Sequence, residues 1–169
     1  MSLKEEIQED IKEAVRGKEE LRSLVLRMVS AAIINKEKEK RYKVSKEEPN
    51  LKEEELVKKS QLTDEELILL ISFEVKKRKD SVFEFEKGKR KDLADKEKKE
   101  IEILKKYLPE QISEEEIKKL TKEAIEKVGA ESLKDMGKVM AELIPKVKGK
   151  ADGGLVSKVV KELLIPKNK

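Results

Sequence analysis

Apolar residues recur at steps of three and four along most of the chain, and this spacing constrains the fold more than any other feature of the sequence. Side chains at these steps share one face of an α-helix, and packing against other helices buries such a face. Apolar and polar residues do not alternate convincingly anywhere, so β-strands are not indicated. The sequence therefore predicts an all-α fold. The longest series are Leu21, Leu24, Met28 and Ala31; Leu67, Ile71, Val75, Arg78, Val82 and Phe85; and Leu93, Glu97, Ile101, Leu104 and Leu108.

Helix-capping patterns indicate where the helices begin and end. A Ser or Thr followed three residues later by Glu or Asp is typical of a helix N-terminus, and glycine is typical of a C-terminus. In the first part of the chain we expect helices over residues 3–16, 18–43, 64–87 and 91–107. Capping patterns start at Ser2, Thr63, Ser113 and Ser132, and the helix-ending glycines are Gly17, Gly88 and Gly129.

Pro109 marks the expected boundary between two domains. Proline disfavours helical geometry in the residue before it, so a helix that reaches Leu108 cannot continue. We expect an N-terminal antiparallel domain of about four helices over residues 1–108, with a surface insertion at residues 42–61 that holds one more short helix. Residues 109–169 are expected to form a small three-helix bundle. Its helices are predicted over residues 114–128, 132–144 and 153–164, with Pro145 ending the second.

The composition excludes several chemistries. The chain has no Cys and no His, so on its own it cannot build a thiol or imidazole nucleophile, a Ser-His-Asp triad, a zinc finger or a haem ligand. Glycine patterns that bind nucleotide phosphates are missing as well, and no carboxylate pair stands out among the 37 acidic residues. We therefore expect no metal site and no cofactor.

The sequence indicates neither a membrane span nor a secretory signal. No run comes near the roughly 18 apolar residues that a spanning helix needs. The amino terminus, MSLKEEIQED, carries acidic residues where a signal peptide would be apolar. We expect a cytoplasmic protein without a membrane partner.

The net charge of +4 is distributed unevenly. Residues 109–137 carry five Lys and eight acidic residues, whereas residues 138–169 carry eight Lys and three acidic residues. A second basic segment, residues 76–91, carries eight basic and three acidic residues. Clusters of this kind neutralise the phosphates of nucleic acids, but ordinary solvated helix faces give the same pattern. Both interpretations stay open for each cluster.

The two basic segments supply the candidate RNA-binding residues. In the C-terminal segment, residues 138–169, Gly149 permits a tight turn, Asp152 is placed to cap the last helix, and Gly153 follows. An ordinary connector explains these three residues but not the lysines around them. The first candidate group is Lys138, Lys146, Lys148, Lys150, Lys158 and Lys161. The second group is Lys76, Lys77, Arg78, Lys79, Lys89 and Arg90.

Arg78 and Glu97 occupy apolar positions of two series, on helices that we expect to pack together. Each long side chain can lie along the edge of the core with its charge in water. The alternative is a partly buried ion pair, joined by Asp80, Arg90 or Asp92, that fixes the helix register or lines a ligand groove.

Short motifs along the whole chain resemble one family. Near the end lie DMGKVM at residues 135–140, PKVKGKADG at 145–153 and VSKVVK at 156–161. Earlier motifs are LRM at 26–28, LTDEE at 62–66, KKRKDS at 76–81, FEKGKRKDL at 85–93 and YLPEQ at 107–111. Together they resemble the GatB/YqeY family, from whose shorter members residues 42–61 differ as an insertion.

The resemblance implies a free-standing protein similar to YqeY, whose C-terminal bundle is similar to the tail of the B subunit of the tRNA-dependent amidotransferase. In that enzyme the tail helps to hold tRNA, while other domains perform the chemistry. Those catalytic domains are missing here, so we do not expect independent catalysis, although the family carries the label of carbon-nitrogen ligase with glutamine as amido-N-donor. The KGKAD segment is shared with the tail, and this implies a tRNA-binding role for Lys148 and Lys150.

We therefore expect an accessory helical protein that binds tRNA or another structured RNA. An amidotransferase or an aminoacyl-tRNA synthetase is the protein partner that the resemblance implies. The alternative is a protein-protein interaction or structural module without RNA binding, which the low aromatic content of 3% favours. A third hypothesis, a ligase in its own right, requires release of glutamate from glutamine in the presence of ATP and misacylated tRNA.

Overall fold

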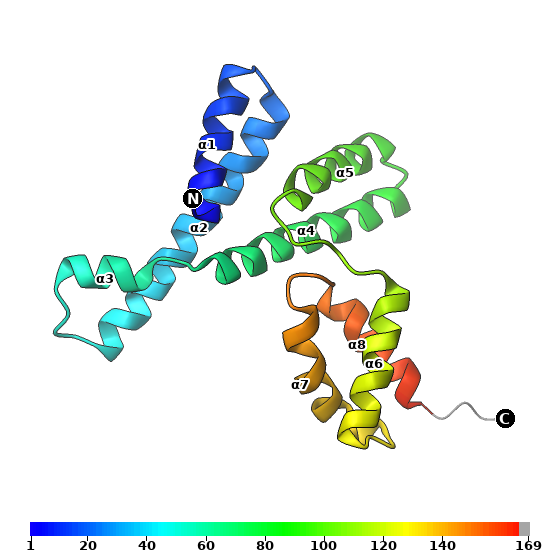
Figure 1. Cartoon of the computed structure of the whole chain (residues 1–169). Helices are drawn as coiled ribbons and strands as arrows, with labels where there is room; N and C mark the ends of the chain where they lie inside the picture. Colours follow the sequence, from blue (N-terminus) through cyan, green and yellow to red (C-terminus); the bar gives the residue numbers. More distant parts are fainter. Residues whose placement is uncertain (166–169) are drawn as a thin grey trace. The chain divides into compact units, whose positions relative to one another are not determined.

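The computed structural model describes residues 1–165 of the chain. Every regular element in this range is helical, with eight α-helices, one short 3₁₀ helix and no strand (Figure 1). The predicted all-α class is therefore confirmed. The chain divides into two compact units, the first over Met1–Tyr107 and the second from Leu108 onward. None of the described helices has the length and apolar character needed to cross a membrane.

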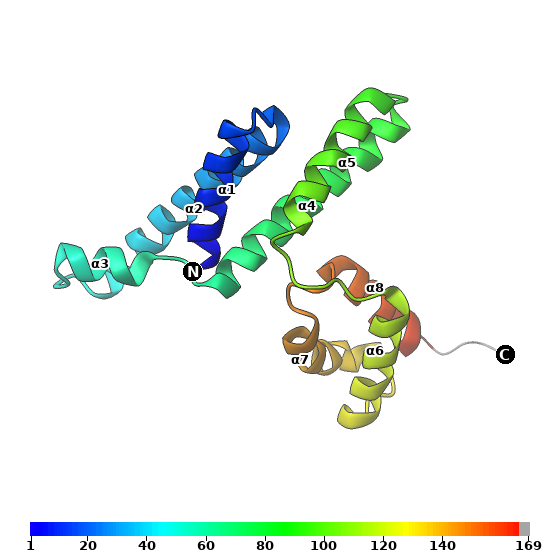
Figure 2. The ribbon, with the colours of Figure 1, turned by 45° about the horizontal axis from the view of Figure 1, so that its top comes forward.

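The first unit consists of two helical hairpins with a short helix between them. Helix α1 (Leu3–Arg16) pairs with α2 (Glu20–Glu47), and α4 (Asp64–Lys87) pairs with α5 (Lys91–Lys105), as Figures 1 and 2 show. Between the hairpins, α3 (Glu53–Ser60) packs on α2 and forms the short helix expected within the insertion. The unit therefore has five helices, and α2 extends four residues beyond its predicted end.

Capping side chains explain why the predicted boundaries of α1 and α4 agree with the structure. The Glu5 carboxylate accepts the Ser2 backbone N–H at 2.8 Å, and the Glu66 carboxylate accepts the Thr63 N–H at the same distance. In return, the hydroxyl groups of Ser2 and Thr63 accept backbone N–H groups of the first turn. These exchanges satisfy donors that the helix itself leaves without a partner. At the other ends, Gly17 and Gly88 close α1 and α4.

The core face of α2 differs from the predicted one. Leu24 and Met28 are 49% and 51% exposed, and Ala31 is exposed as well. The buried face lies on the opposite side of the helix and consists of Val25, Leu26, Val29 and Ile33. Both sets have helical spacing, because α2 is apolar on two sides, so the spacing by itself could not identify the side that is buried.

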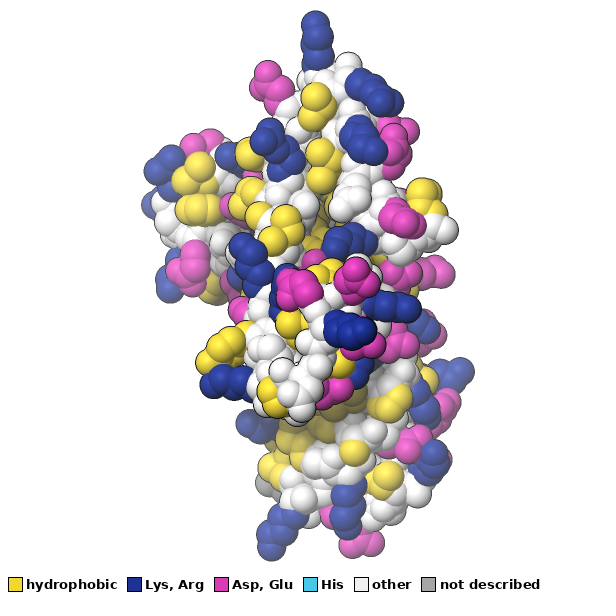
Figure 3. Space-filling view, turned by 90° about the vertical axis from the view of Figure 1, so that its left-hand side faces the viewer, with side chains coloured by type: hydrophobic (Ala, Val, Ile, Leu, Met, Phe, Trp, Pro, Cys, Tyr) yellow, Lys and Arg dark blue, Asp and Glu magenta, His cyan; other side chains and the backbone are white. Residues whose placement is uncertain are grey.

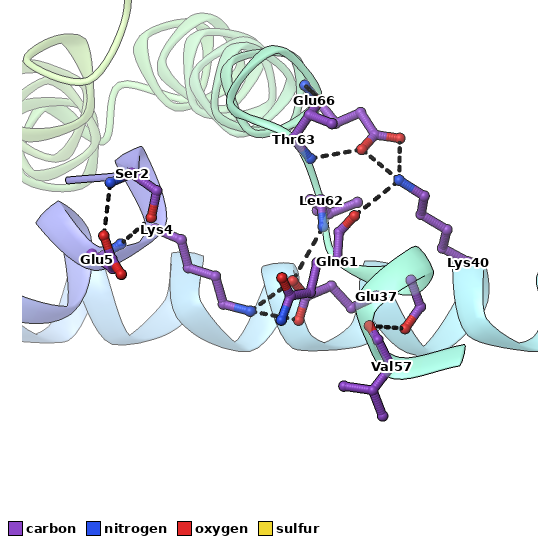
Figure 4. Close-up of polar contacts among 11 residues, drawn as sticks. Ser2, Lys4, Glu5, Glu37, Lys40, Val57, Gln61, Leu62, Thr63 and Glu66 are labelled. Carbon is purple, nitrogen blue, oxygen red and sulfur yellow. Dashed lines mark hydrogen bonds and ion pairs between the residues drawn. The ribbon is translucent and has the colours of Figure 1, made fainter. Parts of the chain in front are cut away.

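Polar contacts connect the start of α1, the middle of α2 and the start of α4 (Figure 4). Glu37 accepts a hydrogen bond from Lys4 Nζ at 2.6 Å and another from the backbone N–H of Leu62 at 3.3 Å. One turn further along α2, Lys40 binds the Glu66 carboxylate at 2.7 Å. The Lys40 hydrogen bond is the main reason why the pKa of Glu66 lies below its ordinary value. These contacts explain why the segment after α3 returns to α2.

A buried tyrosine fixes the end of the first unit. Tyr107 is 6% exposed, and its hydroxyl donates a hydrogen bond to the Asp10 carboxylate on α1. Arg22 on α2 binds the other carboxylate oxygen of Asp10 at 3.1 Å. The residue next to the domain boundary is thus held by both helices of the first hairpin.

We expect Tyr107 to ionise only when the first unit unfolds. Burial, followed by its hydrogen bond to Asp10, raises the pKa of Tyr107 far above the ordinary value of about 10. The raised pKa contributes stability that is fully present below about pH 10 and is lost as the pH rises towards the folded-state pKa, because the unfolded chain ionises first. A Tyr42→Phe variant leaves Tyr107 as the single tyrosine, and its tyrosinate absorbance should rise together with the loss of helical circular dichroism. A tyrosinate signal near the ordinary pKa from a fully helical protein would contradict this prediction.

The second unit is a bundle of three α-helices. They are α6 (Glu114–Val128), α7 (Met136–Val147) and α8 (Gly153–Leu164), and a 3₁₀ turn at Leu133–Asp135 precedes α7. The core is made of small and medium aliphatic residues from all three helices. Its buried members are Ile117, Ala124, Val139, Leu143, Val147, Val156, Val159, Val160 and Leu164.

The prediction that Pro145 ends its helix is wrong. Helix α7 continues through Pro145 to Val147, and the backbone N–H of Lys148 still reaches the carbonyl of Ile144 at 3.0 Å. A proline inside a helix removes one hydrogen bond and leaves the carbonyl four residues earlier without its donor. That carbonyl belongs to Ala141, which is exposed like Pro145 itself, so water can take the place of the missing donor.

Candidate nucleic-acid interface

The candidate site of the second unit lies on the turn between α7 and α8. Lys148 ends α7, and Gly149 follows with a φ angle of 76°. This left-handed conformation favours glycine, and the backbone of Gly149 is buried. Asp152 then caps α8, because its side-chain oxygen accepts the backbone N–H of Leu155 at 3.0 Å.

The segment after Pro109 holds this turn in place. The Gln111 side-chain amide donates to the carbonyl of Gly149 at 2.9 Å and to the carbonyl of Pro109 at 2.8 Å. The backbone N–H of Ile112 donates to the carbonyl of Lys150 at 3.0 Å. Analysis of the sequence missed these contacts, although Gln111 belongs to the YLPEQ motif, which was the available signal.

The six predicted lysines of this unit are all exposed, but they differ in their partners. Three of them lie near a carboxylate one helical turn away, at 3.4 to 3.9 Å. The other three, on the turn and on α8, have no carboxylate within 4.0 Å among residues 1–165. The paired lysines are Lys138, Lys146 and Lys158, and the unpaired lysines are Lys148, Lys150 and Lys161.

Glu142 on α7 is the carboxylate that lies near Lys146. It lies 2.6 Å from Lys127 and 3.4 Å from Lys146, and the hydrogen bond from Lys127 is the main reason why its pKa is lowered. Glu142 therefore stays ionised and offsets part of the local charge. Two further lysines of the basic segment, Lys167 and Lys169, lie outside the described residues.

The basic segment of the first unit forms a smaller surface than predicted, because Arg78 does not belong to it. Arg78 is 5% exposed and lies between two carboxylates, with Nε 2.9 Å from Glu100 and a terminal nitrogen 3.0 Å from Glu74. Two other predicted members are exposed but paired, Lys77 with Glu74 and Arg90 with Asp92. Lys76, Lys79 and Lys89 are exposed and have no carboxylate within 4.0 Å in the described part of the chain.

Neither of the two interpretations offered for Arg78 and Glu97 holds in full. Arg78 does not keep its charge in water, because it is buried, and its ion-pair partner is not Glu97. Glu97 is half-buried, and desolvation is the main cause of its raised pKa. The ion pair forms with Glu100, one turn further along α5. Glu100 also fits the spacing from Leu93 through Glu97 to Leu104, so the same series contained the correct partner. Asp80, Arg90 and Asp92 do not take part in this buried pair.

The described residues offer charged surface groups but no cluster of metal ligands. Among residues 1–165, no group of three or more carboxylates is arranged to hold a metal ion. On the face shown in Figure 3, basic and acidic side chains are intermingled, and hydrophobic side chains reach the surface between them. The arrangement is able to bind an anion through free ammonium groups.

These features define an all-α protein whose second unit presents unpaired lysines on a turn held by hydrogen bonds to its backbone. The chain belongs to the family described as Yqey-like protein, which matches residues 48–164. The match begins within the predicted insertion and includes residues 76–91, Gln111 and the whole three-helix bundle, and it covers the C-terminal basic segment up to residue 164.

A named relative supports the same assignment. It is "Altered inheritance of mitochondria protein 41, mitochondrial" of Pyrenophora tritici-repentis (strain Pt-1C-BFP). The two sequences are 31% identical over 161 residues, which cover 94% of this chain and 78% of the relative. The resemblance to the GatB/YqeY family, inferred from the motifs, is thereby confirmed.

Proposed function

We propose that the protein is an accessory RNA-binding protein, which holds structured RNA, and tRNA in particular, on lysines of its second unit and performs no chemistry of its own. The turn between α7 and α8 carries this proposal. There Lys148 and Lys150 are exposed and without a carboxylate partner in the described residues, while Gln111 and Ile112 hold the backbone. Free ammonium groups on a fixed backbone suit the phosphates of nucleic acids.

The pairing of lysines elsewhere in the chain supports this interpretation over that of an ordinary solvated surface. Several lysines on exposed helix faces bind a carboxylate three residues away, as Lys12 does with Glu9 and Lys36 with Glu39. Such pairing neutralises the surface locally. Among the described residues, Lys148 and Lys150 have no carboxylate within 4.0 Å and so lack this neutralisation.

Charge reversal of Lys148, Lys150 and Lys161 to Glu is expected to weaken tRNA binding by about tenfold or more at low salt. Each lost phosphate contact should also lower the slope of log affinity against log salt by about one. The measurement is filter binding of labelled tRNA between about 50 and 200 mM salt. A matched control reverses Lys119, Lys122 and Lys134, which are exposed, unpaired among the described residues and located in the acidic part of the same unit. Equal losses of tRNA affinity in both variants would show that net charge alone causes the effect and would contradict a site at the turn. Unchanged affinity of the first variant would also overturn the proposal.

The alternative function, a protein-interaction module, is favoured by the exposed apolar face of α2 around Leu24 and Met28. A stoichiometric protein partner that survives nuclease treatment of a native pull-down would support it. An amidotransferase or an aminoacyl-tRNA synthetase is the partner that we propose within the RNA-binding function. We propose the cytoplasm as the place where the protein acts, whereas the name of the relative places that protein in mitochondria.

A further inference from the structure

Most aromatic side chains of this chain lie on its surface. The sequence has three Phe, two Tyr and no Trp. Phe73, Phe83 and Tyr42 are 58%, 65% and 62% exposed. Large aromatic rings normally contribute to cores and interfaces, so their exposure in a chain with so few of them calls for a ligand.

Phe73 and Phe83 share the outward face of α4. This face follows steps of four and three, and the opposite face is buried against the rest of the first unit. Ten residues separate the two rings, which corresponds to about 15 Å along the helix axis. A single nucleic-acid strand spans this distance with about four stacked nucleotides. The outward positions are Leu69, Phe73, Lys76, Asp80 and Phe83.

Each of these rings lies within one helical turn of two lysines. Lys76 and Lys77 follow Phe73, and the Lys77 ammonium lies 5.4 Å from the centre of the Phe73 ring. Lys79 and Lys87 lie four residues before and after Phe83. Lys76, Lys79 and Lys87 are exposed, and none has a carboxylate within 4.0 Å in the range that the structure describes. Free cations therefore lie close to both rings, and one acidic residue, Asp80, lies between the rings on the same face.

This arrangement of two rings with lysines close to each fits a nucleic-acid strand better than a second helix. A helix that packed along this face would bury Lys76 and Asp80 between Phe73 and Phe83, and burying such charges is unfavourable. A single strand offers a base for each ring and a phosphate for each lysine, and stacking accepts any base because every base has a π-face.

We propose that the outward face of α4 binds unpaired nucleotides of RNA. Phe73 and Phe83 stack on bases, and Lys76, Lys79 and Lys87 neutralise the adjacent phosphates. The inference rests on the proposed RNA-binding function for its class of ligand and extends that function to residues of the other unit. It also assigns a role to exposed lysines of the basic segment at residues 76–91, in which Arg78 itself is buried.

The test uses the full chain and a short fluorescein-labelled oligoadenylate, followed by fluorescence anisotropy. Changing Phe73 and Phe83 to Ala is expected to weaken its binding by about tenfold or more, because the stacking of both rings is lost. The matched control changes Leu24 and Met28 to Ala, which removes exposed apolar area from α2 instead. All four side chains are exposed, so each variant should keep the circular dichroism of the parent.

A stacking signature separates this role from a structural one. The sequence contains no Trp, so Phe83→Trp introduces a single indole at the proposed platform. Its fluorescence should be quenched by oligoadenylate, and the variant should bind at least as tightly as the parent. Unchanged affinity of the double Ala variant, or an indole that does not respond to bound RNA, would overturn the inference.

The two RNA proposals fail separately. If the protein binds tRNA but not oligoadenylate, the α4 inference is overturned and the proposed function stands. If it binds oligoadenylate but not tRNA, the α4 inference stands and the proposed role of Lys148 and Lys150 in tRNA binding is rejected. If the parent forms a dimer that the double Ala variant abolishes, and oligoadenylate does not bind, a second copy of the chain occupies the α4 face and the inference is overturned.

Discussion

Replacing Arg78 by Met is expected to lower the free energy of unfolding of the first unit by about 3–5 kcal/mol. Arg78 is buried between Glu74 and Glu100, at 3.0 and 2.9 Å. Its removal leaves the carboxylate of Glu100, which is 6% exposed, without a counter-ion. Lys77 still reaches Glu74 from the surface, so Glu100 is the main source of the loss. Chemical denaturation followed by circular dichroism measures the change.

Two controls separate charge from packing in this experiment. Changing Glu74 and Glu100 to Gln in the Arg78→Met background removes the unpaired charges, and most of the lost stability should return. Replacing the exposed neighbour Lys79 by Met should change the stability by less than about 0.5 kcal/mol. A triple variant as unstable as Arg78→Met would attribute the loss to packing instead.

Replacing Leu143 by Ala is expected to unfold the second unit while the first unit stays helical. Leu143 is fully buried in a core of mainly small aliphatic residues, and truncation of such a residue costs about 2–5 kcal/mol. A bundle of this size is stable by only a few kcal/mol. The helical circular dichroism should therefore fall by the contribution of α6, α7 and α8. Limited proteolysis should cleave the second unit and leave residues 1–107 intact.

The matched control for this prediction lies on the same helix. Ile144, the next residue, is 49% exposed, and its change to Ala should leave the second unit folded. The experiment tests the proposal that the chain folds as two independent units. A Leu143→Ala variant that also lowers the stability of the first unit would show that the two units unfold together.

Helices with strong local signals were predictable from the sequence. The bounds of α1, α4 and α6 agree with the predictions, because a capping side chain opens each of these helices and a glycine closes it. Helix α2 lacks both signals, since Glu19 makes no capping hydrogen bond and Glu48 follows its end. Its predicted end was accordingly four residues short. Local chemistry helps to fix helix ends where it supplies partners for the free backbone groups, although the predicted end of α8 at Leu164 also agrees without a glycine.

Contacts between residues far apart in the sequence were less predictable. The hydrogen bond from Tyr107 to Asp10 joins positions 97 residues apart, and Gln111 reaches Gly149 across 38 residues. No periodicity connects such pairs. From the sequence, Glu97 was considered as a partner of Arg78, and Glu100 was not considered. Both residues fit the helical spacing, and only the rotation of α5 decides between them.

The lysines were visible in the sequence as a charge cluster, but their pairing was not. Lys138, Lys146 and Lys158 each have a carboxylate three or four residues away in the sequence, and in the structure each lies near it. The isolation of Lys148 and Lys150 depends on the turn, which places both residues outside a helix.

In the turn between α7 and α8, the main chain accepts the hydrogen bonds that hold the turn, and the side chains carry its positive charge. Gln111 and Ile112 hold it through the carbonyl oxygens of Gly149 and Lys150, which any residue would supply. The side chains of Lys148 and Lys150 therefore take no part in the hydrogen bonds that hold the turn. We expect a change of their charge, by mutation or by lysine acetylation, to have little effect on the stability of the three-helix bundle. The charge of this surface can therefore vary without loss of the fold.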